Sequence, residues 1–159
     1  MTDPKIEDDL SPVIAGMLRS AREFLAHEHS LFRTLGMKPL LVGRGRTSFS
    51  LSLPPEFAEE TGAIHGGLLT IILDSIMGLT VYTALDELKP IATVNLRIDR
   101  LSRAAVGDRV VCSCETSAIV SEVAYVTGKI IAEAGGAMLA TGAGAFLVGT
   151  KGNVGGSRL

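Results

Sequence analysis

The chain has 159 residues, of which 47% are apolar and 20% charged, and its formal net charge is -2. This length predicts one domain, large enough to bury a core. The charge balance lacks the basic excess that is typical of nucleic-acid-binding proteins, and the acidic start MTDPKIEDDL lacks the basic region of a signal peptide. A mean hydropathy of +0.36 indicates much buried surface, some of which we expect to lie between subunits.

Residues 1–29 are predicted to form an N-terminal helical extension. Ser11 supplies a capping hydroxyl, and Pro12 suits the first helical position. Apolar residues then recur at helical spacing to about residue 28, which favours an amphipathic helix packed on the domain; they are Val13, Ile14, Met17, Leu18, Ala21, Phe24 and Leu25. His27 and His29 diverge on a helix, so we interpret them as solvated side chains and not as metal ligands.

The next segment predicts a short helical turn over residues 30–35, ended by Gly36, and then a hairpin of strands 37–42 and 46–53. In the second strand Phe49, Leu51 and Leu53 alternate with serines, as a half-buried strand requires. The turn at residues 43–45 has two glycines but lacks the third glycine and the strand-then-helix context of a phosphate loop. Residues 56–64 are expected to be a connecting loop, the kind of segment that often carries binding residues.

Residues 63–85, AIHGGLLTIILDSIMGLTVYTAL, are predicted to contain the central helix of the domain. The run from Leu68 is apolar on nearly every side, and a helix of that kind is expected to be buried all round. Its length approaches that of a membrane span, but Asp74 at its middle and the acidic residues after it favour a buried helix of a soluble protein. An ionised carboxylate there is costly unless it is paired or functional, so Asp74 is the leading candidate residue.

Helix geometry places Gly67 and Asp74 on the same side, about 10.5 Å apart along the axis. Gly67 lies in the first turn, where backbone N–H groups lack intrahelical partners and can hold a negative oxygen. The two groups are too far apart to act on one carbonyl within one chain. The spacing therefore predicts a dimer in which each site combines Gly67 of one chain with Asp74 of the partner subunit. A structural role for Asp74, as a cap on the partner's helix, is the alternative.

The rest of the chain predicts four strands, at about residues 91–101, 107–121, 122–133 and 136–148, with glycine turns between them and a loose glycine-rich tail over 149–159. Cys112 and Cys114 share a strand face and are interpreted as buried reduced thiols of a cytoplasmic protein, because residues two apart on a strand make a poor disulfide. The order of helix, two strands, long helix and four strands predicts an α+β domain, with one antiparallel sheet curled round one helix.

Two motifs carry a family resemblance. The first is H-G-G with an aspartate nine residues after the histidine, at His65 and Asp74; the second is ATVNLRIDRLSRAAVGD, residues 92–108. Over residues 30–148 the chain resembles the hotdog-fold acyl-CoA thioesterases of the phenylacetate-pathway (PaaI-like) type, which are related to 4-hydroxybenzoyl-CoA thioesterases. The resemblance implies an antiparallel sheet wrapped around one central helix, here with an extra N-terminal helix, and a homodimer that often pairs into a homotetramer.

The same resemblance assigns catalytic roles. It implies that the Gly67 N–H holds the thioester carbonyl oxygen, while Asp74 of the partner subunit activates water or attacks the carbonyl directly. His65 matches the family histidine that helps place the thioester or hold the loop, and Thr93 falls where relatives carry a serine or threonine near the catalytic water. Gly66 belongs to the same glycine pair, although two glycines could also serve close helix packing.

Three further residues are weighed as substrate-binding candidates. Arg100 and Arg103, near a strand end, could meet CoA phosphates or be solvated surface residues. Glu59 stands six residues before His65, where the family typically has an asparagine. Its carboxylate could repel Asp74, act as another base or point to solvent, and the solvent orientation is preferred.

The sequence thus predicts a cytoplasmic, homo-oligomeric acyl-CoA thioesterase that uses no metal or redox cofactor and takes coenzyme A only as part of its substrate. The alternative from another class is a non-catalytic hotdog protein that binds acyl-CoA or lipid; a purely structural dimer module is disfavoured by Asp74. No G-x-S-x-G elbow of an α/β hydrolase is present. The pattern leaves open the acyl group (aryl or short to medium chain), the choice of dimer or tetramer and the nucleophile or base role of Asp74.

Overall fold

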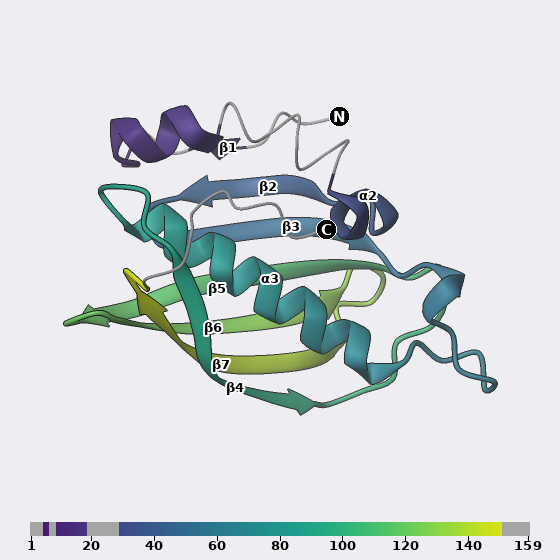
Figure 1. Cartoon of the computed structure of the whole chain (residues 1–159). Coiled ribbons are helices and arrows are strands. Elements are labelled where there is room, and N and C mark those ends of the chain that lie inside the picture. Colours follow the sequence, from purple (N-terminus) through teal and green to yellow (C-terminus); the bar gives the residue numbers. More distant parts are fainter. Residues whose placement is uncertain (1–4, 7–8, 19–28, 151–159) are drawn as a thin grey trace.

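The computed structural model describes residues 5–6, 9–18 and 29–150. Within these residues one seven-stranded sheet wraps around a single long helix (Figure 1). The elements in chain order are β1 (Lys5–Ile6), a first helix over residues 12–18, α2 (Ser30–Thr34), β2 (Lys38–Gly43), β3 (Arg46–Ser52), the short 3-10 helix η1 (Pro55–Phe57), α3 (Gly66–Ala84), β4 (Ile91–Arg100), β5 (Arg109–Val120), β6 (Val123–Ala132) and β7 (Met138–Val148).

The strand order is β1-β2-β3-β5-β6-β7-β4, and every neighbouring pair is antiparallel except β1 with β2. Because β4 follows α3 in the chain and pairs with β7, the sheet receives its last edge strand from the middle of the sequence. The α+β hotdog architecture expected from the sequence is confirmed. The two-residue strand β1 has no counterpart among the predicted elements.

The core lies between the concave face of the sheet and α3. Phe49, Leu51 and Leu53 are buried on this face, as their alternation with serines predicts. Across the next strand, Cys112 and Cys114 are buried free thiols whose sulfur atoms lie 3.9 Å apart. The hydrogen bond with Cys114 and burial together raise the pKa of the Cys112 thiol well above its usual value, and the burial of both side chains makes them packing residues.

The expectation that the central helix is buried on every side does not hold within a single chain. The side of α3 that meets the sheet is buried, but Asp74 and Leu79 are only half-buried and Ile71 is 43% exposed. In length and composition α3 could cross a membrane, yet half of its apolar window is buried inside the domain, as in the core helix of a globular fold. The physical reason is geometric: one curled sheet covers one side of a helix, and the described residues on the opposite side of α3 cover it only in part.

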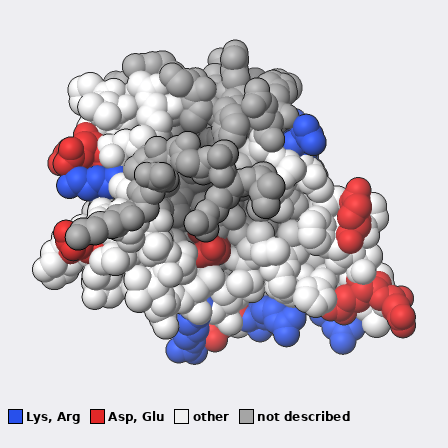
Figure 2. Space-filling model, viewed as in Figure 1, with Lys and Arg blue, Asp and Glu red and all other residues white. Residues whose placement is uncertain are grey.

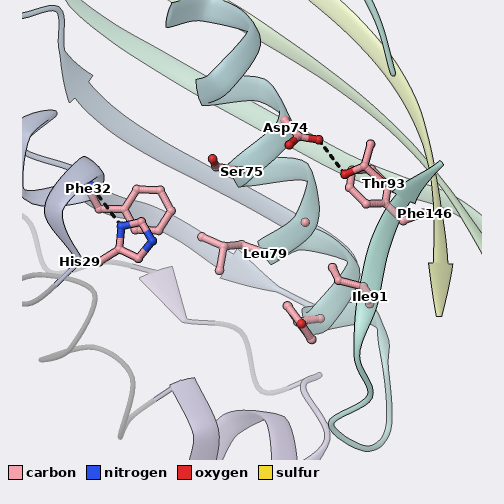
Figure 3. A pocket seen from close by; sticks show the side chains of 10 residues that line it. His29, Phe32, Asp74, Ser75, Leu79, Ile91, Thr93 and Phe146 are labelled. Carbon is pink, nitrogen blue, oxygen red and sulfur yellow. Dashed lines mark hydrogen bonds between the residues drawn. The ribbon is translucent and has the colours of Figure 1, made fainter. Parts of the chain in front are cut away.

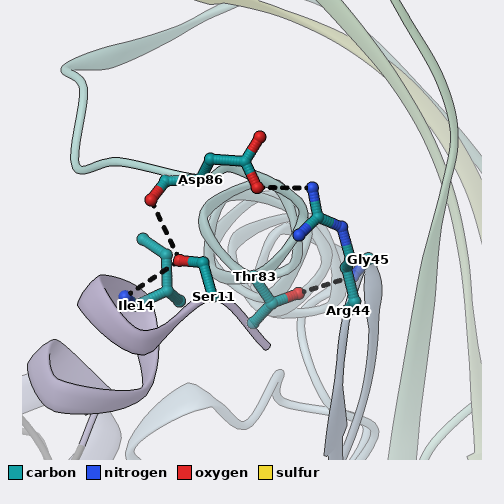
Figure 4. Close-up of polar contacts among 6 residues, drawn as sticks. All are labelled: Ser11, Ile14, Arg44, Gly45, Thr83 and Asp86. Carbon is teal, nitrogen blue, oxygen red and sulfur yellow. Dashed lines mark hydrogen bonds and ion pairs between the residues drawn. The ribbon is translucent and has the colours of Figure 1, made fainter. Parts of the chain in front are cut away.

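The first helix is anchored to the C-terminal end of α3 (Figure 4). The Ser11 hydroxyl accepts a hydrogen bond from the Ile14 N–H at 3.2 Å, which confirms the predicted cap, and donates to the carbonyl oxygen of Asp86 at 3.0 Å. Ile14 is fully buried, whereas Val13 is 55% exposed and does not belong to the packing side expected for it. The predicted continuation to residue 28, with His27, falls in residues 19–28, outside the described residues.

The hairpin of β2 and β3 is also fixed to this end of α3. Arg44 at its turn pairs with Asp86 at 2.7 Å, and the Gly45 N–H donates to Thr83 Oγ1 at 3.0 Å (Figure 4). Deeper in the core, Thr47 of β3 meets Thr80 of α3, with 2.6 Å between their hydroxyl oxygens. These polar contacts set the position of the helix along the sheet.

Candidate functional site

His65 caps the start of α3 with its side chain. The imidazole Nδ1 accepts a hydrogen bond from the Gly67 N–H at 3.1 Å, so this ring satisfies one of the backbone donors of the first turn. The loop before the helix is held by two backbone bonds, from the His65 N–H to the carbonyl of Phe57 and from the Ile64 N–H to that of Ala104, at 2.8 and 2.9 Å. The predicted first-turn position of Gly67 is therefore correct, and in this structure its N–H already has an acceptor.

Asp74 lies two turns further along the same helix and is paired with β4. The Thr93 hydroxyl donates to Asp74 Oδ1 at 2.9 Å, so a neutral donor orients one carboxylate oxygen (Figure 3). Of the residues expected to work together, the structure brings Thr93 to Asp74, and it places His65 and Gly66 beside Gly67. Within one chain, Gly67 and Asp74 are seven residues apart on α3, which is about 10 Å along the helix axis.

A β-bulge in β4 aims Thr93 at the helix. Thr93 pairs with Phe146 and Asn95 with Ala145, so Val94 is an extra residue without a partner. The bulge shifts the alternation by one residue, and Thr93 therefore faces α3 together with Leu96 and Ile98. In a regular strand, strict alternation would place Thr93 on the face opposite Val94, Leu96 and Ile98. The bulge instead turns the Thr93 side chain towards α3 and leaves Val94 65% exposed.

A cavity of about 320 Å³ opens beside Asp74 along the partly covered side of α3. In Figure 3 Asp74 and Thr93 stand at one end, and His29 and Phe32 stand across the helix from them. The described residues that line it are mostly apolar and aromatic: His29, Phe32, Asp74, Ser75, Gly78, Leu79, Tyr82, Ile91, Thr93 and Phe146. Burial raises the pKa of the Tyr82 hydroxyl above its usual value, so this side chain is uncharged at neutral pH.

His29 differs from its interpretation as a solvated side chain. It is half-buried, its Nδ1 accepts a long 3.5 Å bond from the Phe32 N–H at the start of α2, and its ring stacks on that of Phe32 with 4.2 Å between centroids. His29, Phe32 and Phe146 were not identified as site residues from the sequence. They come from distant segments that meet only in the folded chain, so no local motif could have indicated them.

The remaining candidates lie near the start of α3. Glu59 and Glu60 are exposed, in keeping with the preferred solvent orientation, and the Glu59 N–H donates to the carbonyl of Ala63 at 2.8 Å. Arg103 is exposed in the loop after β4. Arg100 is also exposed, but its side chain packs across Gly66, because a Cβ built on Gly66 would overlap the guanidinium and lie 2.8 Å from Arg100 Cδ. The lack of a side chain at Gly66 therefore makes room for Arg100.

The fold matches solved structures of thioesterases. The zebrafish thioesterase superfamily member 2 is 16% identical with a TM-score of 0.72, over 84% of this chain and 96% of that one. The phenylacetic acid degradation protein PaaI of Thermus thermophilus, in a mutant form, is 22% identical with a TM-score of 0.64, over 72% and 95%. A hypothetical thioesterase of Streptococcus pneumoniae, solved with coenzyme A, is 17% identical with a TM-score of 0.65, over 70% and 87%.

No curated protein sequence matches the chain. The family model of the thioesterase superfamily matches residues 61–139, a stretch that holds the His65-to-Asp74 motif and all of β4. Together with the PaaI-like fold, this match places the protein in the thioesterase superfamily of thioester hydrolases, with the hotdog fold.

Proposed function

We propose that the protein hydrolyses an acyl-CoA thioester in a site shared by two chains. The observation that carries this proposal is the Asp74–Thr93 pair, which presents an oriented carboxylate beside an apolar cavity. The thioester carbonyl oxygen would sit at the first turn of one helix, at the Gly67 N–H, and Asp74 of the partner subunit would take a proton from the attacking water or attack the carbonyl itself. Such chemistry needs neither a metal nor a redox cofactor.

The Gly67 N–H must exchange one acceptor for another in this scheme. Its present acceptor is the exposed imidazole of His65, which could turn away as the carbonyl oxygen arrives. His65 is then a positioning residue that keeps the first turn capped between turnovers. The cavity beyond Asp74 would take the acyl group, and its aromatic and aliphatic lining favours an apolar or aryl acyl chain.

The edges of the sheet favour a second copy at β4. On one side β1 pairs with β2 and covers that edge; on the other, β4 has a strand neighbour only in β7 within the described residues. A bare strand edge offers unpaired N–H and C=O groups to another strand. Figure 2 shows basic side chains, with acidic ones among them, along the lower margin of this face, where Figure 1 places β4. Pairing there would bring a second α3 towards the Asp74–Thr93 pair.

The first experiment measures released thiol from a panel of aryl- and alkyl-CoA esters with purified protein of known oligomeric state. We expect Asp74→Ala to lose about 10²-fold or more of kcat, as the removal of a general base does. The matched control is Asp99→Ala, because that exposed carboxylate is on the opposite face of β4 and pairs with Arg97. Binding of CoA esters without turnover by either protein would instead make this a non-catalytic binding protein.

Shared sites are tested by mixing two inactive variants. Gly67→Pro removes the N–H at a helix position that tolerates proline, and Asp74→Ala removes the carboxylate. Co-refolded at equal amounts, they should regain about a quarter of wild-type activity, since half of the randomly paired dimers would contain one intact site of two. A mixture that stays inactive, while size and fold are normal, would place the whole site within one chain.

A further inference from the structure

Arg100 occupies an unusual position at the start of α3. It is the last residue of β4 and pairs with buried Ala140, so it shares the inner face of the sheet with Thr93 and Ile98. Its guanidinium lies against Gly66, where a Cβ would be 2.7 Å from Arg100 Cζ. Arg100 is thus directed at the turn that begins the helix, one residue from the N–H proposed to hold the carbonyl oxygen.

The Arg100 guanidinium has no acidic partner among the described residues, a property that it shares with Lys38, Arg103 and Lys129 but combines with a position against the first turn of α3. Other basic side chains there, among them Arg44, Lys89, Arg97 and Arg109, pair with carboxylates within 3.2 Å. Arg100 forms no ion pair or hydrogen bond with a described residue, and the N-terminal end of a helix is itself positively polarised. A guanidinium held there is stabilised when negative charge arrives between it and the first turn.

We propose that Arg100 is a catalytic residue that donates a hydrogen bond to the thioester carbonyl oxygen and stabilises the negative charge it gains. This rests on the proposed function. As water adds to the carbonyl carbon and loses a proton to Asp74 of the partner subunit, the C=O π pair moves to oxygen, between Arg100 and the Gly67 N–H. The C=O bond then re-forms, the C–S bond breaks, and the thiolate leaves and takes up a proton, giving a carboxylic acid and CoA.

The position distinguishes this role from the recognition of CoA phosphates. Those phosphates are separated from the thioester by the whole pantetheine arm, whereas Arg100 contacts the glycine next to Gly67. A guanidinium presents several N–H donors in a fixed plane, so one can point at the carbonyl oxygen while the side chain rests on Gly66. Both arginines are exposed, but Arg103 lies in the loop after β4 and does not contact Gly66, so it is the better placed of the two for a distant phosphate.

The test compares Arg100→Gln and Arg100→Lys with wild type on two thioesters of one acyl group, the CoA ester and the N-acetylcysteamine ester, which has no phosphate. We expect Arg100→Gln to lower kcat by about 10²- to 10³-fold on both, the loss typical of one oxyanion donor, and Arg100→Lys to recover part of it. Arg97→Gln, from the outer face of the same strand, is the matched control and should keep wild-type kcat. Circular dichroism and native mass establish that each variant is folded and assembled.

Each other outcome overturns the proposal in a recognisable way. A rise in KM confined to the CoA ester would assign Arg100 to a phosphate. A loss that appears as an upward shift of the acid limb of the kcat/KM profile would make it a partner of Asp74. Unchanged kinetics would leave it a surface residue and the proposed function intact. A wild-type protein that hydrolyses neither ester would remove the proposed function, and this role with it.

Discussion

Thr93 and Asp74 are joined by a 2.9 Å hydrogen bond between the edge strand β4 and the central helix α3. The hydroxyl donates, so the carboxylate is oriented by a neutral group and keeps its other oxygen for water. This contact depends on the extra residue Val94, since a regular strand would send the Thr93 side chain to the other face.

Replacing Thr93 tests the importance of that orientation. Thr93→Val keeps the shape of the side chain but removes the donor, and we expect kcat to fall about tenfold, in line with the loss of one hydrogen bond to a charged group. Thr93→Ser should retain most activity. Steady-state thiol release measures both, and equal rates for Val and Thr at this position would show that the hydroxyl does not act on Asp74.

Gly66→Ala is expected to act through Arg100. The new methyl would occupy the space of the guanidinium and displace it, so kcat should fall as in Arg100→Gln while the helix itself gains from the better former at that position. In the Arg100→Gln background the same substitution should have little further effect. Additive losses in the double variant would mean that Gly66 serves the site independently.

The hydrogen bond between Thr47 and Thr80 in the core predicts that replacing one threonine destabilises the fold more than replacing the other. Thr80 Oγ1 donates to the carbonyl of Ile76 at 2.7 Å, so its single proton is used and Thr47 must donate to it. Thr80→Val leaves the buried Thr47 hydroxyl without an acceptor and should cost about 1–3 kcal/mol of unfolding free energy. Thr47→Val should cost less, and the double variant less than the sum. Urea unfolding gives all three values, and equal single effects would contradict the assigned direction.

Alanine substitutions at two glycines, one in β6 facing α3 and one within α3, are expected to have opposite effects on stability. A Cβ on Gly128 would lie 2.7 Å from Cys114 Sγ and 2.9 Å from Leu73 Cδ2, so Gly128→Ala should destabilise by about 1–3 kcal/mol through overpacking. Within α3, a Cβ on Gly78 would meet Ile91 Cδ1 at an ordinary 3.6 Å. Gly78→Ala should therefore stabilise by about 0.5–1 kcal/mol and raise KM for bulky acyl groups, because Gly78 lines the cavity. Thermal unfolding of both variants is the check.

Glu133 gives a pH dependence of stability on the outer face of the sheet. The Ser50 hydroxyl donates to Glu133 Oε1 at 2.6 Å and Arg109 Nε to Oε2 at 3.2 Å, and these contacts lower the pKa of the carboxyl. Its stabilising contribution is complete above the unfolded-state pKa and disappears as the pH falls through the lower folded-state value. Glu133→Gln should therefore reduce the loss of urea midpoint between about pH 7 and pH 3. A parallel loss in both proteins would exclude this residue as a contributor.

Much of the fold follows from local pattern. The alternation of apolar residues with serines predicted β3, and the apolar run after Gly67 predicted α3. Both elements leave such a pattern because one strand face, or much of a helix, is buried. The strand order does not follow, since the pairing of β4 with β7 joins segments far apart in the chain. The bulge at Val94 is one residue long and leaves no period, so the alternation of β4 does not reveal that Thr93 faces Asp74.

The candidate site also has a part that local sequence indicates and a part that depends on contacts between distant segments. Gly67 and Asp74 were identifiable as candidates because their spacing on one helix has a chemical meaning, whereas His65 and Gly66 were indicated by the resemblance of the motif to a known family. The cavity wall and the contact of Arg100 with Gly66 were not, because they depend on where β4 ends relative to the start of α3. The exposure of Ile71 on α3 was missed for a related reason: composition alone does not tell which side of an apolar helix meets the sheet.

The two-residue strand β1 makes the two edges of the sheet unequal as sites for pairing with another chain. With Lys5–Ile6 laid along Leu41 and Val42, the sheet ends at that margin in a two-residue strand, a poorer template for a further strand than the ten-residue edge of β4. Two copies joined at β4 would form one continuous sheet whose outer margins are both β1, so addition of strands would stop at two chains and no open filament could form. A short N-terminal segment far from the chemistry would then determine that the assembly is closed.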